Sequence, residues 1–402
     1  MLKRIYRDQP ISRQELGVQT RLSANRVSTL VTRLLDEHLL EERSVAHGGL
    51  GRPPGELSVH PGLARVVGLD IGGQHSRAML CDARSRALAV EAWPTEAVPD
   101  RETVLDNVVR LVESVCRNGG IRPDQLTALG VGVRAIVDPR SGIVMSFPNT
   151  PAWTVAWSGL NVPEEMRRRL GVQHVAVDDS VRAMGLAGAR FGPARGIASY
   201  VYVFLGNGIG SAVFLHGRPY VGRSGMAGEL GHVSVIEDGP WCTCGNRGCL
   251  EVIASTSAIL QRVKDRLTEV HTLSQLTDAH ARGQLTLTAL FDAAKAGDKL
   301  AYQILTDTGA HVGRVLAIAL NLLDPELVVI GGPLVHDDGI LVDAIRREVR
   351  MRALPHISRQ LRIEIDRQGA MSGARGAALL ALDQAFDDPV VLAEVLASRP
   401  QS

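Results

Sequence analysis

The sequence predicts two parts of different fold class: a small, mainly helical N-terminal unit over residues 1–60 and a larger α/β body. Three observations lead to this division. Two helix patterns, the second of them amphipathic, and two strand patterns fill the N-terminal unit. From Pro61 onward, apolar strand patterns end in glycine turns. With 41 glycines and only 4% aromatic residues, the chain suits tight strand-to-helix turns better than an aromatic-rich β-sandwich.

Composition excludes several classes of protein. A chain of 402 residues predicts two or three domains. Hydrophobic residues at 45% and charged residues at 22% exclude a wholly disordered chain, and a net charge of +1 excludes a polycation. No uncharged apolar run approaches the length of a membrane helix, and the N-terminus has no signal-peptide pattern. We therefore expect a cytoplasmic protein with no membrane partner.

The N-terminal unit opens with two capped helices. Ser12 is followed three residues later by Glu15, a capping-box pattern for a short helix that ends near Thr20. Ser23 is expected to cap a second helix. One face of that helix carries apolar residues at the i, i+3, i+4 and i+7 positions, namely Val27, Leu30, Val31 and Leu34.

Two strands, over residues 39–45 and 56–59, follow the helices and are joined by a Gly/Pro-rich turn that carries Arg52. Helix, helix, hairpin is the order of a winged helix-turn-helix, and its expected partner is operator DNA. Arg52 would enter the minor groove. The alternative is a protein-interaction module, because residues 1–60 hold nine basic and seven acidic residues and are only weakly basic. The residues of the second helix expected to meet phosphates and base edges are Ser23, Asn25, Arg26, Thr29 and Arg33.

The body contains three apolar strands that each end in a glycine turn. Such turns let backbone N–H groups approach a phosphate, and an acidic residue at a strand end can approach its Mg²⁺. Three of them indicate a two-lobed nucleotide-binding fold with a central cleft, although tight turns without a ligand would give the same pattern. The residues of these turns are Asp70, Gly72 and Gly73, then Gly206, Gly208 and Gly210, then Gly331 and Gly332.

The most specific pattern is a group of metal-ligand residues in the order His-x9-Cys-x-Cys-x4-Cys. Three thiolates and one imidazole match a closed tetrahedral zinc site, which leaves no position for a reacting water and is therefore structural. The alternative is a redox-active thiol cluster, which the Cys-x-Cys spacing and the histidine argue against. Cys81 and Cys116 lie apart in apolar contexts and are expected to be buried. The predicted zinc ligands are His232, Cys242, Cys244 and Cys249.

Together these residues resemble the ROK family (repressors, open reading frames and sugar kinases), specifically its regulators with a helix-turn-helix. The resemblance covers nearly the whole chain and implies the actin-like, ribonuclease-H-type two-lobed fold. It divides the body into a first lobe over residues 61–182 and a second over 183–402, with a C-terminal helix returning to the first. Besides the metal segment, the matching blocks are Asp70-Ile71-Gly72-Gly73, Phe147-Pro148-Asn149, Val177-Asp178-Asp179, Gly206-Asn207-Gly208-Ile209-Gly210 and Ile330-Gly331-Gly332.

The resemblance also implies roles for single residues. His232 would hold zinc through one ring nitrogen and face the sugar with the other. Asp179 corresponds to the base that deprotonates the attacked hydroxyl in the kinases, which use ATP and Mg²⁺. Carboxylates and amides suit sugar hydroxyls because ionised acceptors form strong hydrogen bonds. The implied sugar-binding residues are Asn149, Asp179, Glu229, His232 and Glu251.

The sequence departs from the kinase pattern at positions that would face phosphate. Arg134 stands in a segment where the kinases carry Gly-(Ile/Val)-Pro-Gly, and the other departures are Gln74, Asn207 and Ala212. Lost hydroxyls and added bulk would weaken positioning of a transferred phosphate. We therefore expect a sugar-responsive transcriptional repressor, a homodimer or dimer of dimers that binds a small sugar or sugar phosphate. The alternative is an active ATP-dependent sugar kinase with a DNA-binding head.

Overall fold

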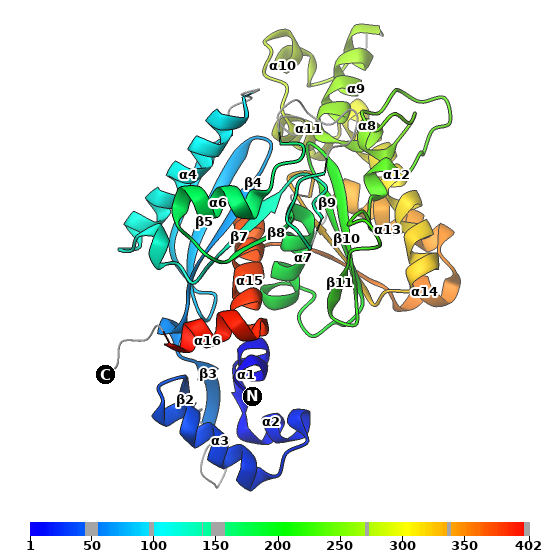
Figure 1. Ribbon diagram of the computed structural model, residues 1–402. Coiled ribbons are helices and arrows are strands. Elements are labelled where there is room, and N and C mark those ends of the chain that lie inside the picture. Colours follow the sequence, from blue (N-terminus) through cyan, green and yellow to red (C-terminus); the bar gives the residue numbers. More distant parts are fainter. Residues whose placement is uncertain are drawn as a thin grey trace.

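In the computed structural model, the first 60 residues form a small unit, here called the head (Figure 1). The structure describes residues 1–44, 55–95, 100–138, 140–145, 157–269, 273–335 and 339–397. A three-stranded antiparallel sheet in the order β1-β3-β2 lies beside the head's helices. The elements of the head are α1 (Leu2–Asp8), β1 (Ile11–Ser12), α2 (Arg13–Thr20), α3 (Ala24–Asp36), β2 (Leu40–Ser44) and β3 (Gly55–Val59).

The two predicted helix starts are confirmed in the head. Ser12 and Glu15 form both bonds of a capping box at the start of α2, and Ser23 accepts from the backbone N–H of Arg26 at the start of α3. On α3, Val27 and Val31 are buried against the head's core. The helix α1 and the strand β1 were not predicted from the sequence.

A five-stranded mixed sheet forms the centre of what we call the first lobe, in the order β6-β5-β4-β7-β8. The helices α4 and α6 pack on one face, where Val67 and Leu69 of β4 point. The helix α15 packs on the other face, against Val66. The elements of this lobe are η1 (Pro61–Leu63), β4 (Arg65–Ile71), β5 (His75–Asp82), β6 (Ala87–Pro94), α4 (Arg101–Asn118), η2 (Pro123–Gln125), β7 (Ala128–Val133), α6 (Val162–Leu170) and β8 (Val175–Asp179).

A second five-stranded sheet, in the order β11-β10-β9-β12-β13, forms the centre of the second lobe. The helix α7 (Ser180–Phe191) covers one face, and α8, α9, α11, α12 and α13 cover the other. The remaining elements are β9 (Tyr200–Leu205), β10 (Ile209–Leu215), β11 (Arg218–Tyr220), η3 (Leu230–His232), α8 (Leu250–Ala254), α9 (Thr256–Glu269), α10 (Thr277–Ala281), α11 (Leu287–Lys295), α12 (Lys299–Leu323), β12 (Leu327–Gly331), α13 (Ile340–Arg352), α14 (Pro355–Gln360), β13 (Arg362–Ile365), η4 (Gly369–Met371), α15 (Ser372–Asp387) and α16 (Pro389–Ala397).

The helices α7 and α15 pack side by side and run from the region between the lobes towards α1 (Figure 1). The expected boundary after residue 182 falls inside α7. This helix begins at Ser180, directly after the last strand of the first sheet, and its apolar side packs on the second sheet. Among the described residues, no helix combines the length and apolar character needed to cross a membrane.

The head shares a hydrophobic core with the body. Ile5 and Tyr6 of α1 belong to the same buried cluster as Phe386 of α15 and Val391 of α16. The ring of Tyr6 stacks on that of Phe386 with centroids 4.2 Å apart, and its hydroxyl donates to Asp383 at 2.8 Å. The head is therefore packed onto the body and is not an independent domain joined to it by a linker alone.

A second group of contacts at this junction comes from α7. The guanidinium of Arg190 lies 4.9 Å from the centroid of the Tyr6 ring and donates to the backbone carbonyls of Tyr6 and Arg7. Asp387 of α15 pairs with Arg7 and, at 3.0 Å, with Lys3. One end of α7 and one end of α15 thus contact α1.

Candidate metal centre and ligand cleft

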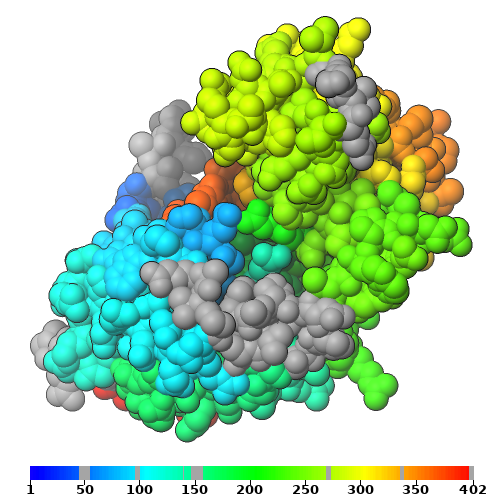
Figure 2. All heavy atoms as spheres, turned by 90° about the horizontal axis from the view of Figure 1, so that it is seen from above, coloured from blue at the N-terminus to red at the C-terminus, as the bar shows by residue number. Residues whose placement is uncertain are grey.

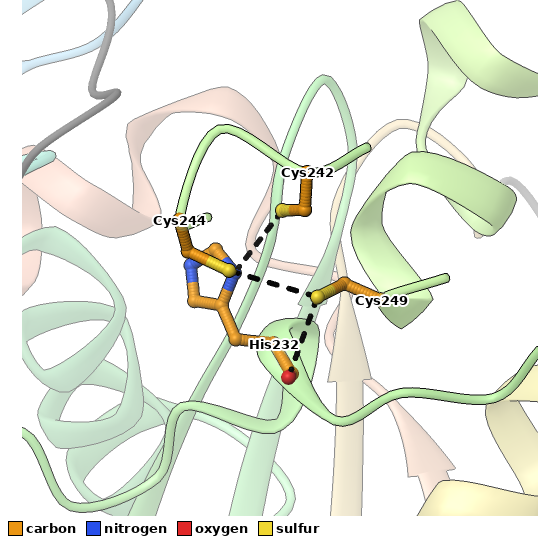
Figure 3. A group of neighbouring side chains, drawn as sticks. All are labelled: His232, Cys242, Cys244 and Cys249. Carbon is orange, nitrogen blue, oxygen red and sulfur yellow. Dashed lines mark hydrogen bonds between the residues drawn. The ribbon is translucent and has the colours of Figure 1, made fainter. Parts of the chain in front are cut away.

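The four predicted zinc ligands lie together in the second lobe (Figure 3). The Sγ atoms of Cys244 and Cys249 are 3.6 Å apart, and Nδ1 of His232 is 3.5 Å from Sγ of Cys242. All four ligand atoms lie within 4.8 Å of one another. Zinc–sulfur bonds of about 2.3 Å in a tetrahedron place ligand atoms about 3.8 Å apart, so the donor set and its spacing both fit a zinc ion.

The loop that carries the cysteines is folded by its own backbone. The N–H of Cys242 donates to the carbonyl of Asn246 at 2.7 Å, and the N–H of Gly248 donates to that of Pro240 at 2.8 Å. Gly248 has a φ of +63°, and a Cβ atom there would lie 1.7 Å from the carbonyl oxygen of Ile236. Glycine is therefore required for the turn that delivers Cys249 to the cluster.

The second ring nitrogen of His232 faces away from the cysteines. Nε2 lies 4.0 Å from a carboxylate oxygen of Glu229. Glu251, in the first turn of α8, accepts from the backbone N–H of Ile209 at 2.9 Å, where β10 begins. Three of the implied sugar-binding residues are thus gathered at one end of β10, and the metal centre holds one of them.

Asp179 lies at the end of β8 and begins α7. Its carboxylate accepts from the backbone N–H groups of Val181 at 2.8 Å and Arg182 at 3.1 Å, so it caps the helix. Burial raises the pKa of Asp179 to about 7; the charge of Arg182 lowers this pKa and the neighbouring Asp178 raises it. A carboxyl group that titrates near neutral pH suits either a proton acceptor or a hydrogen-bonding partner of a hydroxyl.

Asp70 is a second buried carboxyl group, at the end of β4. Burial raises its pKa to about 6, against the hydrogen bond that Ser180 donates at 2.9 Å. Sequence reasoning missed Ser180, although it directly follows Asp179 and lies on the strand-to-helix turn after β8, two strands from β4 in the sheet.

Arg182 was also missed. It is buried, its Nε donates to Asp178 at 2.6 Å, and another nitrogen donates to the carbonyl of Gly225 at 2.8 Å. The only sequence signal was an aspartate and an arginine spaced i, i+4. Through its ion pair with Asp178 and its bond to Gly225, Arg182 connects the Asp178–Asp179 corner to the segment that leads to Glu229.

The surface is hollowed between the blue-to-cyan first lobe and the yellow-green helices of the second (Figure 2). The glycine turns lie near one another, because Gly73 and Gly208 both face Arg134 and Gly206 faces Pro333. The predicted strands and turns at Asp70, Gly72 and Gly73, at Gly206, Gly208 and Gly210, and at Gly331 and Gly332 are all present. Gln74 and Asn207 are exposed in these turns. Ala212 requires a correction: it is buried in the apolar cluster with Tyr200 and Phe214 beneath α7 and does not face phosphate.

The predicted DNA-contacting residues of α3 are all exposed on one helix. Arg33 pairs with Glu37 at 2.8 Å, and the hydroxyl of Thr29 donates to the carbonyl of Asn25 at 3.0 Å. Arg52 and Asn149 lie outside the described residues. The exposed residues are Ser23, Asn25, Arg26, Thr29 and Arg33.

Comparisons with known proteins agree with this architecture. The DNA-binding transcriptional repressor Mlc of Escherichia coli is 31% identical over 370 residues, which are 91% of this chain and 88% of Mlc. A solved ROK family transcriptional regulator, described as a homologue of E. coli Mlc, superposes with a TM-score of 0.81 at 27% identity, over 99% of this chain and 98% of that one.

A solved kinase is also similar, over a smaller part of this chain. The ROK family glucokinase of Streptomyces griseus, solved with glucose and AMPPNP, has a TM-score of 0.67 at 26% identity, over 79% of this chain and 99% of the kinase. The ROK family model itself matches residues 66–384. The chain therefore belongs to the ROK family.

Proposed function

We propose that the protein is a sugar-responsive transcriptional repressor that binds operator DNA through its head. The observation that carries this proposal is the extent of the similarity. The match to Mlc covers 91% of this chain, and the match to the solved ROK regulator covers 99%, so both extend into the head. The glucokinase covers 79% of the chain.

The exposed face of α3 supports the DNA-binding part. A helix that begins with Ser23 and presents Asn25 and Arg26 in its first turn offers backbone N–H groups and polar side chains to phosphates and base edges. In this proposal the head is a winged helix-turn-helix, and a homodimer or dimer of dimers reads a two-fold-related operator. The site of action is the cytoplasm.

The cluster around β10 supports the ligand-binding part. Glu229, His232 and Glu251 present carboxylate and imidazole groups, and Asp179 faces them from the start of α7. Such acceptors match the hydroxyls of a sugar. A structural zinc, held by His232 and three cysteines, would fix the ring orientation of His232 and the course of the loop.

The route from the cleft to the head supports the regulatory part. Asp179 caps one end of α7, and Arg190 at its other end contacts Tyr6 of the head. The helix α15 packs against α7 and against α1. A sugar that closes the lobes would therefore shift helices that end on the head, and the link over Pro61–Leu63 would follow. The ligand must bind two closure states unequally for this shift to regulate DNA binding.

An electrophoretic mobility shift assay tests the proposal. The probe is DNA from upstream of the protein's own gene, titrated with salt and with a panel of hexoses, pentoses and N-acetyl sugars. We expect a shift that weakens steeply with salt, because phosphate contacts release counterions, and that one sugar class alters. A binding curve that is flat in salt, or unaffected by any sugar, contradicts the proposal.

An assay of ADP release with the same sugars and Mg²⁺-ATP addresses the kinase alternative. We expect no robust turnover, because Gln74 and Asn207 stand in turns where the kinases carry hydroxyl residues. Turnover that disappears in Asp179→Ala would establish a kinase instead.

A further inference from the structure

Arg134 lies between the glycine turns of the two lobes, beside Gly73 of the first and Gly208 of the second. It directly follows β7, the strand beside β4 in the first sheet. Across the described residues, its guanidinium takes part in no recorded hydrogen bond or ion pair. Arg182, by contrast, is buried in its ion pair with Asp178. An unpaired guanidinium between two lobes is available to a ligand.

The position of the guanidinium is set by two glycines on opposite sides. A Cβ atom on Gly208, in the turn between β9 and β10, would lie 2.1 Å from Nη2 of Arg134. A Cβ atom on Gly73, in the turn after β4, would lie 3.2 Å from Nη1. A side chain at either position would displace the guanidinium. The absence of a Cβ atom at Gly73 and Gly208 therefore leaves the space that it occupies. Each lobe approaches a different nitrogen of the fork.

The same point of the cleft is next to the proposed sugar site. The carboxylate of Glu251 also lies against Gly208, with an oxygen 2.8 Å from a Cβ atom placed there. That oxygen already accepts from the N–H of Ile209. One ligand can therefore contact Glu251 with a hydroxyl and Arg134 with an anionic group.

We propose that Arg134 forms a subsite for a single phosphoryl group, carried by the ligand of the cleft. The planar guanidinium fork matches two oxygens of a phosphate, which makes arginine well suited to phosphate recognition. The phosphoryl group can come from a phosphorylated sugar, from inorganic phosphate or from a nucleotide. This inference rests on the proposed sugar-binding function, and it adds Arg134 as the residue that selects the charge of the ligand.

Calorimetric titration of the full-length protein with matched ligands tests the subsite. The ligands are glucose, glucose 6-phosphate, glucuronate, inorganic phosphate and Mg²⁺-ATP, and other sugars of the panel replace glucose if they bind better. We expect the phosphorylated sugar to bind about tenfold or more tightly than its neutral parent. Arg134→Gln should abolish this difference and leave the affinity for the neutral sugar unchanged. Arg134→Lys should keep part of it, and Arg140→Gln, an exposed arginine of the following segment, should keep all of it.

The possible outcomes separate the subsite from the proposed function. Equal affinity for neutral and phosphorylated sugar overturns the subsite and leaves sugar sensing intact. An equal loss for both sugars in Arg134→Gln overturns it too, because Arg134 would then only position Glu251. A gain for glucuronate that matches the gain for the phosphate overturns the assignment to phosphate. Binding of inorganic phosphate or ATP that depends on Arg134, without binding of any sugar, supports the subsite and contradicts the sugar-sensing function.

Discussion

The metal centre and the junction between head and body are assembled over very different lengths of chain. The metal ligands lie within 18 consecutive residues, His232 to Cys249, and the loop between them is folded by its own backbone bonds. The junction brings Tyr6 together with Arg190 and Phe386, from the beginning, middle and end of the sequence. In the proposed function, the first region holds a ligand-facing side chain in place. The second ties the head to α7 and α15, the two helices that run from between the lobes. The proposal thus assigns ligand binding and its transmission to separate regions of the fold.

The largest effect is expected from a variant that disrupts the metal centre. Cys244→Ser should release the metal and lower the free energy of unfolding by about 5 kcal/mol, or roughly 10 °C in Tm, because metal binding contributes directly to folding. Sugar affinity should fall as well, since His232 loses its support. Elemental analysis and thermal unfolding measure these changes. Cys116→Ala, at a buried cysteine outside the cluster, should keep the metal. A full metal content in Cys244→Ser would show that the ligands are assigned wrongly.

The next largest effect is expected from variants that disrupt the junction between head and body and leave the metal centre unchanged. Tyr6→Ala removes a buried ring that stacks on Phe386, which should lower stability by about 3–5 kcal/mol and abolish operator binding. Metal content should be unchanged. Tyr6→Phe keeps the ring and removes the bond to the half-buried Asp383, so a loss of about 1–2 kcal/mol is expected. Chemical denaturation with metal analysis checks both variants, and loss of metal from Tyr6→Ala would mean that the two regions are not independent.

A smaller effect is expected from a variant that separates sugar binding from its transmission to the head. Arg190→Gln removes the donors to the Tyr6 and Arg7 carbonyls but leaves the Tyr6–Phe386 stack. We expect normal sugar affinity, and a sugar-induced change in operator affinity that is reduced by about 1–2 kcal/mol, within the usual range of coupling free energies. Arg195→Gln, at an exposed arginine beyond α7, serves as the control. Unaltered coupling in Arg190→Gln would remove α7 from the proposed route.

The smallest effect concerns pH. Asp179 has a pKa of about 7 in the folded protein and about 3.9 when unfolded, so the folded state binds more protons between these values. Stability from this group is therefore greatest at low pH and is lost as pH rises towards 7, with roughly 1.4 kcal/mol lost between pH 6 and pH 8. Asp179→Asn, which can still cap α7, should flatten the pH dependence of Tm. An identical slope in this variant would contradict the assignment.

The sequence predicted those features whose parts are close along the chain. Ser12 and Ser23 mark the helix starts of the head, and the His-x9-Cys-x-Cys-x4-Cys spacing gives the metal cluster. The strand-to-glycine turns could be predicted equally well, because each strand and its turn lie within about ten consecutive residues. The roles of Glu229 and Glu251 came only from the resemblance, since a single carboxylate is otherwise indistinguishable from a solvated surface charge.

Features that depend on partners far along the chain could not be predicted. The helix α1 has only a short apolar set, Leu2, Ile5 and Tyr6, and its stability comes from α15, almost the whole chain away. Ser180 meets Asp70 because the sheet order places β8 two strands from β4 and turns α7 back towards it. Arg134 could be recognised as unusual, but its place between Gly73 and Gly208 required both lobes. Ala212 was misread because the side of β10 that it occupies depends on packing beneath α7.

The packing of α1 on α15 and α16 has a consequence for protein synthesis. A ribosome makes the head before α15 and α16, yet Ile5 and Tyr6 find apolar partners in those two helices, among them Phe386, Val391 and Val395. An unfinished or prematurely terminated polypeptide therefore lacks an ordered head. In the proposed function, only chains that include α15 and α16, and with them the proposed ligand-binding lobes, would compete for a promoter.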